Sequence, residues 1–345
     1  NFFMAMNFKE GRWNHEINVT DFVKTNITPY EGDASFLTGP TERTKAVWNK
    51  CLEALAEERA NNGIRSLDPS TVSTITSFAP GYIDKENEVI VGLQTDEVLR
   101  RAIKPFGGIK VVEKACRENG VEVDPRVKDI FTHYRKTHND GVFDAYTEEI
   151  RSFRSLGFLT GLPDNYARGR IIGDYRRLAL YGLDRLIEAK QNDLRHLTGP
   201  MTDARIRLRE EVAEQIKALK EIKIMGEQYG LELGRPALNA QEAVQWVYMA
   251  YLAAVKEQDG AAMSLGNVSS FLDIYIEYDM THGLLDEAHA QELIDQFVIK
   301  LRMVRHLRMQ AYNDIFAGDP TWVTESIGGR FNDGRTKVTK NFFFF

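Results

Sequence analysis

Four arginines crowd the stretch 157–177, which reads GFLTGLPDNYARGRIIGDYRR. Two glycines and a proline near its start prevent a continuous helix and favour turns. We expect Asp174 to cap a helix that runs from Tyr175 to Lys190. Guanidinium groups beside a glycine-rich turn at a helix start suit an anion such as a carboxylate or phosphate. The alternative is a basic loop on the solvated surface, because the stretch matches no established phosphate motif. The arginines are Arg168, Arg170, Arg176 and Arg177.

The familiar motifs of catalysis are otherwise missing from the sequence. It contains no GxxxxGK[ST] loop, no GxGxxG fingerprint, no HExxH pair and no GxSxG elbow. The seven histidines are scattered and form no cluster with cysteine, so we expect no metal site. Cys51 lies on the core-facing side of an expected helix and is interpreted as packed rather than reactive. Residue types and spacing alone therefore indicate a largely helical protein that could bind an anion.

Composition narrows the class of protein further. A chain of 345 residues can bury a large core in one or two domains. Its net charge of −6 argues against a nucleic-acid partner. No apolar run approaches the roughly 20 residues that span a bilayer, and the start lacks the basic region of a signal peptide. Two cysteines exclude a disulfide framework and favour a reducing compartment. We therefore expect a cytoplasmic protein without a membrane or nucleic-acid partner.

The elements that must position these residues are mainly helices, because apolar residues recur three and four positions apart. Residues 1–40 are expected to be irregular with short helices. Residues 71–78 fit no single type, and 269–278 fit either a helix or a buried strand. The segment 202–228 fits a packed bundle helix or a coiled-coil partner. Strands are too weakly indicated to place. Helices are expected over 41–60, 96–103, 109–119, 125–137, 175–190, 202–228, 239–255 and 286–307, with one more ending at Arg154.

Several segments are distinctive in their full sequence rather than their spacing. In chain order they are PFGGIK (105–110), YRKTHNDGVFDAY (134–146), GLPDNYARGRIIGDYRR (161–177), NAQEAVQW (239–246), YLAAVKEQDGAAMS (251–264), KLRMVRHLR (300–308) and GDPTWVTESIGG (318–329). Through them the chain closely resembles pyruvate formate-lyase, from about residue 7 to residue 341. The segments follow one another in the same order, which argues against a chance match.

The resemblance implies a glycyl radical enzyme, a formate C-acetyltransferase of anaerobic glucose metabolism. Such an enzyme converts pyruvate and coenzyme A into acetyl-CoA and formate. In this family a backbone glycyl radical passes to two adjacent cysteines, and a thiyl radical adds to the pyruvate carbonyl. The acetyl group is then handed to coenzyme A, so covalent catalysis splits one hard step into two. The family is homodimeric, needs no bound metal and is activated by a separate S-adenosylmethionine radical enzyme.

The resemblance also implies site residues. Arg170 corresponds to the arginine that binds the pyruvate carboxylate, which agrees with the bidentate match between a guanidinium and a carboxylate. Phe316 and Trp322 correspond to walls of the active site, although either could be a plain core aromatic. Ala261 corresponds to a residue at the substrate pocket. We expect these four residues to bind substrate.

A second set of residues matches the region where the family docks coenzyme A. Phe143, Arg154 and Tyr166 correspond to the residues that surround its adenine. Coenzyme A is the co-substrate, and the radical is carried by the protein itself. These three residues are the expected coenzyme A contacts.

The implied fold is an α/β barrel of about ten strands surrounded by helices. Residues 1–345 would be the helix-rich N-terminal half of one large domain, because they contain neither adjacent cysteines nor a C-terminal glycyl loop. Cys51 and Cys116 do not match the catalytic pair, so no catalytic residue is expected in this chain. The run Phe342–Phe345 is an aggregation hazard unless it is buried.

Three other interpretations of the chain are considered. It could be a catalytically inactive truncated fragment, or a scaffold that binds pyruvate or coenzyme A without turnover. It could belong to a sibling 2-ketobutyrate formate-lyase, which this part of the sequence does not separate from the pyruvate enzyme. A diol dehydratase is disfavoured because the context of the carboxylate-binding arginine is intact.

Overall fold

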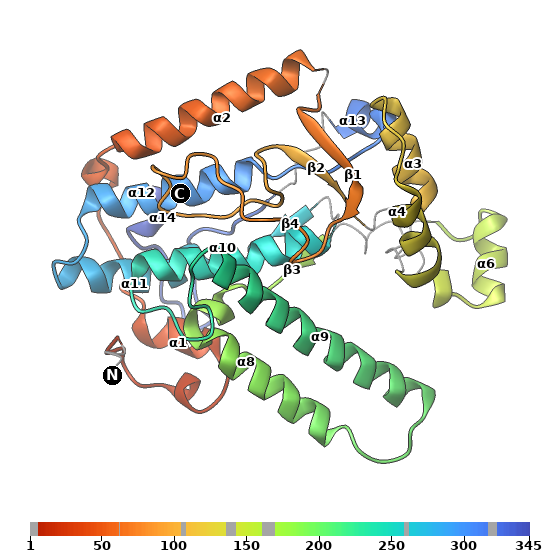
Figure 1. The fold of residues 1–345 in the computed structure, drawn as a ribbon. Helices are drawn as coiled ribbons and strands as arrows, with labels where there is room; N and C mark the ends of the chain where they lie inside the picture. The colour runs from red at the N-terminus through yellow and green to blue at the C-terminus, as the bar shows by residue number, and fades with distance from the viewer. Residues whose placement is uncertain are drawn as a thin grey trace.

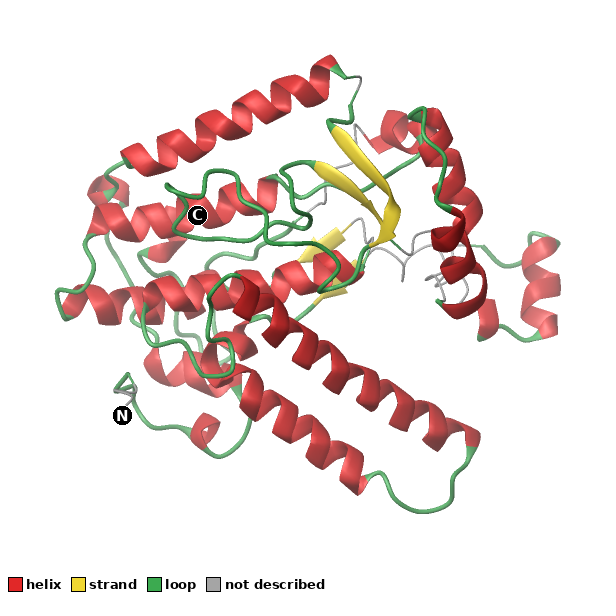
Figure 2. Cartoon of the chain, viewed as in Figure 1, coloured by secondary structure: helices red, strands yellow, loops and turns green. Residues whose placement is uncertain are grey.

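A computed structural model describes residues 6–61, 63–104, 108–135, 143–160, 170–258, 262–316 and 323–345. These residues are mostly helical with a few short strands (Figure 1; Figure 2). The strands are β1 (Ser66–Val72), β2 (Arg100–Ile103), β3 (Arg170–Ile172) and β4 (Ala262–Ser264). The α-helices are α1 (Val19–Asn26), α2 (Glu42–Ala60), α3 (Ile109–Glu118), α4 (Pro125–Asp129), α6 (Glu148–Ser155), α8 (Arg176–His196), α9 (Asp203–Gln228), α10 (Ala240–Glu257), α11 (Ser269–Thr281), α12 (Glu287–Arg302), α13 (Gln310–Phe316) and α14 (Asn341–Phe344).

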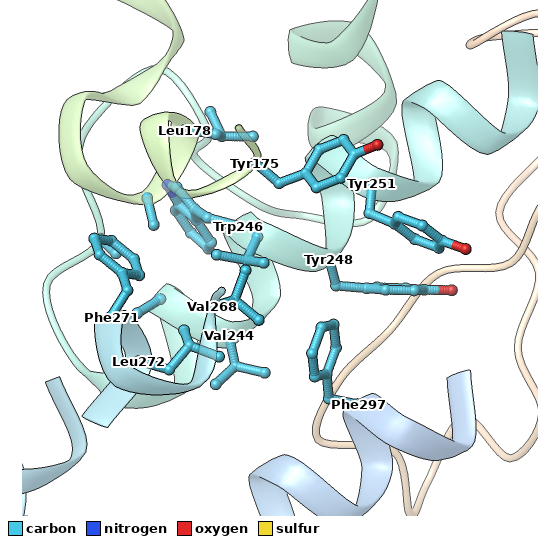
Figure 3. Packing of buried hydrophobic residues seen from close by; sticks show 14 of the residues in the cluster. Tyr175, Leu178, Val244, Trp246, Tyr248, Tyr251, Val268, Phe271, Leu272 and Phe297 are labelled. Atoms are coloured by element: carbon cyan, nitrogen blue, oxygen red, sulfur yellow. The ribbon is translucent and has the colours of Figure 1, made fainter. Parts of the chain in front are cut away.

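Helix α10 lies in the middle of the main hydrophobic core. Its residues are apolar nearly all the way round, which is the pattern of a helix covered on every side. Trp246 and Tyr248 are almost wholly buried, and Figure 3 shows them packed among residues of the neighbouring helices. Phe297 of α12 meets the Tyr248 ring edge-on, with the centroids 6.2 Å apart. The core therefore holds α8, α11 and α12 around α10.

Several helices begin at side-chain caps. The hydroxyls of Thr41 and Thr202 accept hydrogen bonds from the first turns of α2 and α9. The side chain of Asn239 accepts one from the Glu242 amide, 2.8 Å away, at the start of α10. These bonds satisfy amide groups that have no partner inside the helix. The helices predicted over 41–60, 109–119, 202–228 and 239–255 are confirmed, with ends that differ by one or two residues.

The start of α8 differs from the prediction. The residue before α8 is Tyr175, which makes no side-chain cap, so the predicted cap at Asp174 is wrong. The Asp174 carboxylate instead accepts a hydrogen bond from Arg176 Nε at 2.8 Å. The helix also continues past Lys190 and ends at His196, and it is kinked at Gly182, where φ is +72°. A side chain at that glycine would collide with the backbone of Arg235.

Residues 96–103 are not the helix that the sequence predicts. Arg100 to Ile103 form β2, which pairs in parallel with β1 through Ser66↔Arg100 and Leu67↔Arg101. The pairing partner lies more than thirty residues earlier, so local propensity gives no sign of it. The ambiguous segment 71–78 includes only the last two residues of β1 and is otherwise loop.

The structure also shows the type or the end of four further segments. Residues 269–278 are helical and form most of α11, and nearly all of them are buried. Helix α9 packs along α8, which confirms a helix packed within this chain (Figure 1). Helix α12 ends at Arg302, so 303–307 is not helical as predicted. The predicted helix 125–137 is α4 followed by a π-helical turn that ends at Tyr134.

The aromatic C-terminal run is packed against earlier parts of the chain. Phe344 is 5% exposed, and its ring lies 5.3 Å from that of Phe36, edge to face. Phe345 meets Phe297 of α12 in the same way. The backbone of Val338 accepts a hydrogen bond from Tyr30, which joins this end to the N-terminal arm. Packing thus buries Phe344 and half-buries the other three phenylalanines, which lowers the hazard of an exposed aromatic run. No helix in the described part of the chain is long and apolar enough to cross a bilayer.

Candidate functional site

The parallel pair β3–β4 carries the first of the predicted substrate residues. Its Cα partners are Arg170↔Ala262, Ile171↔Met263 and Ile172↔Ser264. The backbone of Arg170 therefore lies beside the residue that follows Ala261 in the chain. Two positions far apart in sequence, both predicted to contact substrate, are carried by neighbouring strands.

A third segment joins this pair beyond the end of β4. The amide of Leu265 donates to Thr324 O at 2.9 Å, and Ser326 N donates to Gly266 O at 2.7 Å. The segment 323–326 directly follows Trp322, another predicted substrate residue. The three chain segments predicted to contribute Arg170, Ala261 and Trp322 thus converge around β4. We call this arrangement the β4 junction, and define it as β3, residues 262–270 and residues 323–329.

Some predicted residues cannot be placed in the same detail. Ala261, Trp322 and Tyr166 lie outside the described residues. The side chains of Arg170 and Phe316 also lie outside the description, although their backbones are the first residue of β3 and the last of α13. Their roles remain predictions.

Two of the three predicted coenzyme A residues meet where the last turn of α6 lies against the segment that precedes this helix. The guanidinium carbon of Arg154 lies 5.1 Å from the centroid of the Phe143 ring, in a cation–π contact. Tyr146 meets the same ring edge-on. Arg154 is exposed and Phe143 is half-buried, so a planar group can approach this contact from solvent. Aromatic faces and guanidinium planes are the surfaces on which proteins stack nucleobases.

Glu325 is a half-buried acidic residue at the β4 junction, with its Oε2 atom wholly buried, and the sequence offers no reason to single it out. Its Oε1 accepts hydrogen bonds from Val268 N at 2.7 Å and Ser269 N at 2.8 Å, at the start of α11. Burial raises the pKa of Glu325 to about 7. The two hydrogen bonds and the positive charge of Arg176 lower this pKa, but their combined effect is smaller than that of burial. No local pattern could reveal this group, because its partners lie more than fifty residues earlier.

Arg176 also stabilises the β4 junction, and its guanidinium is bonded to groups within the protein. Its Nη1 donates to Asn267 O at 3.2 Å, while its Nε bonds to Asp174. It therefore ties the start of α8 to the loop between β4 and α11. Of the four arginines that the sequence offered for an anion, this one has a structural role. Arg168 lies outside the described residues.

The end of α10 connects the junction to the other strand pair. Arg135 Nη2 bonds to Glu257 Oε2 at 2.8 Å, and its Nη1 donates to Ser73 O at 3.0 Å, just past β1. Ser73 Oγ donates to Lys256 O at 2.7 Å. Lys256 is 2% exposed, and burial lowers its pKa to about 8. The chain runs from here towards β4, so β1 and β4 are linked through the end of this helix.

The two cysteines have the properties of packed core residues. Cys51 and Cys116 are both free and fully buried. Burial raises the pKa of Cys51 to about 12 and that of Cys116 to about 11. A thiol in this state carries little thiolate and is a poor nucleophile. In the part of the chain that the structure describes, no group of three or more His, Cys, Asp or Glu side chains is placed to hold a metal ion.

The sequence is similar to known proteins over nearly its whole length. Residues 10–345 match the family model described as pyruvate formate lyase-like. A formate acetyltransferase from Haemophilus influenzae (strain Rd) is 55% identical over 341 residues. That alignment covers 97% of this chain but 44% of the relative. The chain thus spans less than half the length of the curated relative.

The fold is similar to those of solved glycyl radical enzymes and dehydratases. A B12-independent glycerol dehydratase from Clostridium butyricum superposes with a TM-score of 0.65 at 17% identity, covering 90% of this chain and 46% of that one. A hydroxyproline dehydratase from Clostridioides difficile gives 0.64 at 15% identity, covering 89% and 46%. A glycyl radical enzyme from Archaeoglobus fulgidus gives 0.53 at 15% identity, covering 93% and 45%. At such low identity these likenesses concern the fold alone.

Proposed function

The chain belongs to the pyruvate formate lyase-like family, and from this we propose that it is part of a formate C-acetyltransferase that cleaves pyruvate with coenzyme A. The observation that carries the proposal is the convergence at the β4 junction. Three segments that match the family at Arg170, Ala261 and Trp322 are distant in sequence, yet their backbones meet around one short strand. The identity of 55% to a formate acetyltransferase supports the same reaction.

At the β4 junction, Arg170 binds and orients the pyruvate carboxylate. A guanidinium presents two parallel N–H donors to a carboxylate, which fixes the plane of the substrate as well as its position. Trp322 and Phe316 wall the site and exclude water, and Ala261 leaves room for the substrate. In this proposal the residues of this chain bind and orient the substrate. The protein-derived glycyl radical, when present, supplies the homolytic chemistry from residues outside this chain.

The contact between Phe143 and Arg154 receives the adenine of coenzyme A. The cation–π pair is already formed, so a base that stacks on it need not order both side chains on binding. Tyr166 would contribute a further contact. Coenzyme A then takes up the acetyl group as co-substrate.

The proposal extends to the setting of the enzyme. Residues 1–345 form the N-terminal part of one large domain, whose barrel of about ten strands would extend the two parallel pairs seen here. The catalytic cysteines and the glycyl loop belong to the rest of that domain. The enzyme is a cytoplasmic homodimer, and a separate S-adenosylmethionine radical enzyme activates it. It uses no metal of its own.

The test is the substitution Arg170→Lys in the complete, activated protein, with acetyl-CoA formation measured against pyruvate concentration. Lysine keeps the charge but loses the two-point match to the carboxylate. The loss of about 2 kcal/mol corresponds to a fall of roughly 30-fold in kcat/KM for pyruvate. Arg177→Lys on α8 is the matched control, with an expected change below about twofold.

Two outcomes would contradict the proposal. Unchanged pyruvate kinetics in Arg170→Lys would remove the carboxylate role from this residue. A complete protein that binds pyruvate without forming acetyl-CoA would instead favour the inactive binding scaffold. The same assay with 2-ketobutyrate in place of pyruvate separates the sibling formate-lyase.

A further inference from the structure

We propose that Glu325 is a positioning residue of the β4 junction, which fixes the segment after Trp322 against β4 and thereby sets the width of the substrate site. The proposal rests on the function proposed above, since it concerns the same site. It assigns to Glu325 no contact with the substrate.

The carboxylate joins two segments that are otherwise held by few bonds. Glu325 Oε1 accepts from both Val268 N and Ser269 N, at 2.7 and 2.8 Å. The backbone pairs Leu265–Thr324 and Ser326–Gly266 lie on either side of it. Two charge-assisted bonds from one oxygen are stronger than the neutral backbone bonds beside them. Glu325 is therefore the strongest single link between 265–269 and 324–326.

The same carboxylate is also the cap of α11. Val268 precedes the helix and makes no side-chain cap of its own, so the first amides depend on Glu325. A cap usually comes from the residue at the helix start, within three or four residues of its partner. Here it comes from a segment more than fifty residues later. The start of α11 and the segment after Trp322 thus cannot separate without exposing unsatisfied amides.

The surroundings of Glu325 distinguish it from an ordinary surface cap. Its Oε2 is buried and has no hydrogen-bond partner within the described residues. Burying a carboxylate oxygen in this way costs free energy, which a cap alone does not require. Asp286, the cap of α12, has a side chain that is 66% exposed and so avoids this cost. The buried position is explained if the carboxylate must draw the segment inward.

A second contact closes the loop beyond Glu325. Asn267 Nδ2 donates to Gly328 O at 3.4 Å, and Ser270 Oγ donates to Asn267 Oδ1 at 2.5 Å. Gly328 and Gly329 both have positive φ, at +66° and +93°, which turns the chain away after the junction. The segment 323–329 is therefore held at Thr324, Glu325, Ser326 and Gly328, and Trp322 directly precedes this segment in the chain. Moving this segment moves the wall of the proposed site.

The experiment compares Glu325→Ala with Asp286→Ala in the complete protein. Both variants remove a carboxylate that caps a helix, so both are expected to lower Tm by similar amounts. Only Glu325→Ala is expected to raise the KM for pyruvate, by about tenfold to a hundredfold, because small displacements of a site wall have effects of this size. Asp286→Ala is expected to stay within about twofold. Glu325→Gln keeps the accepting oxygen and is expected to restore most of the loss.

Hydrogen exchange provides a readout that does not depend on turnover. Peptides covering 265–270 and 323–329 are expected to exchange at least about tenfold faster in Glu325→Ala, with no change there in Asp286→Ala. Unchanged exchange in these peptides would overturn the proposal, because the carboxylate would then not hold the segments. Faster exchange with a KM like that of the control would overturn the positioning role. A wild-type protein that neither binds nor cleaves pyruvate would overturn the proposed function itself, and this inference with it.

Discussion

The two parallel strand pairs of this protein are stabilised by opposite kinds of buried charge. At β1–β2, Arg101 is fully buried, and its Nη1 bonds to Glu58 Oε2 of α2 at 2.7 Å. The other oxygen of Glu58 accepts from Arg305 Nε at 3.3 Å. At β3–β4 the buried ionisable groups include carboxyls, such as Glu325, whose pKa burial raises to about 7.

The difference separates a fixed scaffold from a region that responds to its surroundings. Arginine stays protonated at any pH that the protein meets, so Arg101 and Arg305 keep their positive charges near neutrality. Carboxyls with a pKa of about 7 change protonation there, and with it the strength of their hydrogen bonds. The pair that carries the predicted substrate residues thus has beside it a carboxyl, Glu325, that titrates near neutrality. A substitution in either region tests this contrast.

The largest effect is expected from Glu58→Ala. The substitution leaves two buried guanidinium groups, Arg101 and Arg305, without their shared carboxylate, which is 13% exposed. Removing one partner of a buried ion pair lowers the free energy of unfolding by about 3–5 kcal/mol, because the other charge is left buried without compensation. The free energy of unfolding, measured in urea, is expected to fall by that amount. Glu53→Ala, at an exposed position of the same helix, is the control and should change little. Equal stability of the two variants would show that the network contributes nothing.

A smaller change, a gain in stability, is expected from Asp273→Asn on α11, the helix that follows β4 in the chain. Asp273 is fully buried on α11, and its Oδ1 accepts from Asn341 N at 3.0 Å. Burial raises its pKa from 3.8 to about 7, so the folded protein binds a proton that the unfolded chain releases between these values. Stability from this group is therefore full below about pH 4 and is lost as the pH rises through 7.

The substitution by asparagine removes that loss, because the amide is neutral at every pH. We expect Asp273→Asn to raise the free energy of unfolding by about 1–3 kcal/mol at pH 8 and to flatten its decline between pH 4 and 7. Urea unfolding at pH 5 and pH 8 measures both. The same pH dependence in the wild-type protein and the variant would show that other groups cause it.

The smallest effect is expected from Glu257→Gln, which weakens the link between the two pairs. The side chains of Arg135 and Glu257 are 22% and 36% exposed, so solvent screens part of their attraction. The cost in stability is therefore expected to be about 1 kcal/mol or less. Hydrogen exchange at residues 73–75 should nevertheless increase, while exchange at 265–270 stays constant. Increased exchange in both segments would mean that the pairs are coupled through α10 more tightly than these bonds indicate.

The helices could be predicted from the sequence because their signals are local. The cap at Asn239 lies directly before the helix that it starts. The apolar positions within α9, and those within α10, recur every three or four residues, so periodicity indicates both helices. The error at Asp174 arose where a nearby arginine competes for the same carboxylate. Local signals also gave no warning of β2, whose partner is distant, nor of strands as short as β3 and β4.

The site was predictable only as far as the family resemblance extends. Arg170 and Ala261 were assigned by matching segments, and the strand pairing then brings their backbones together. The contact of Phe143 with Arg154 agrees with the assignment of both to one region, although their role is untested. Glu325 lies within the matched segment 318–329, but it has no hydrogen-bond partner nearby in the sequence that would single it out. Its significance depends on two segments that meet only in the folded chain.

The parallel pairing of β3 with β4 also bears on how the protein folds. The whole of α8, α9 and α10 lies between these strands along the chain, so their meeting closes a long loop. The entropy of closing such a loop must be overcome before the pairing contributes any stability. The intervening helices, which depend on local contacts, can form earlier and shorten the distance that the ends must search. The β4 junction is therefore expected to assemble late, after the hydrophobic core is in place.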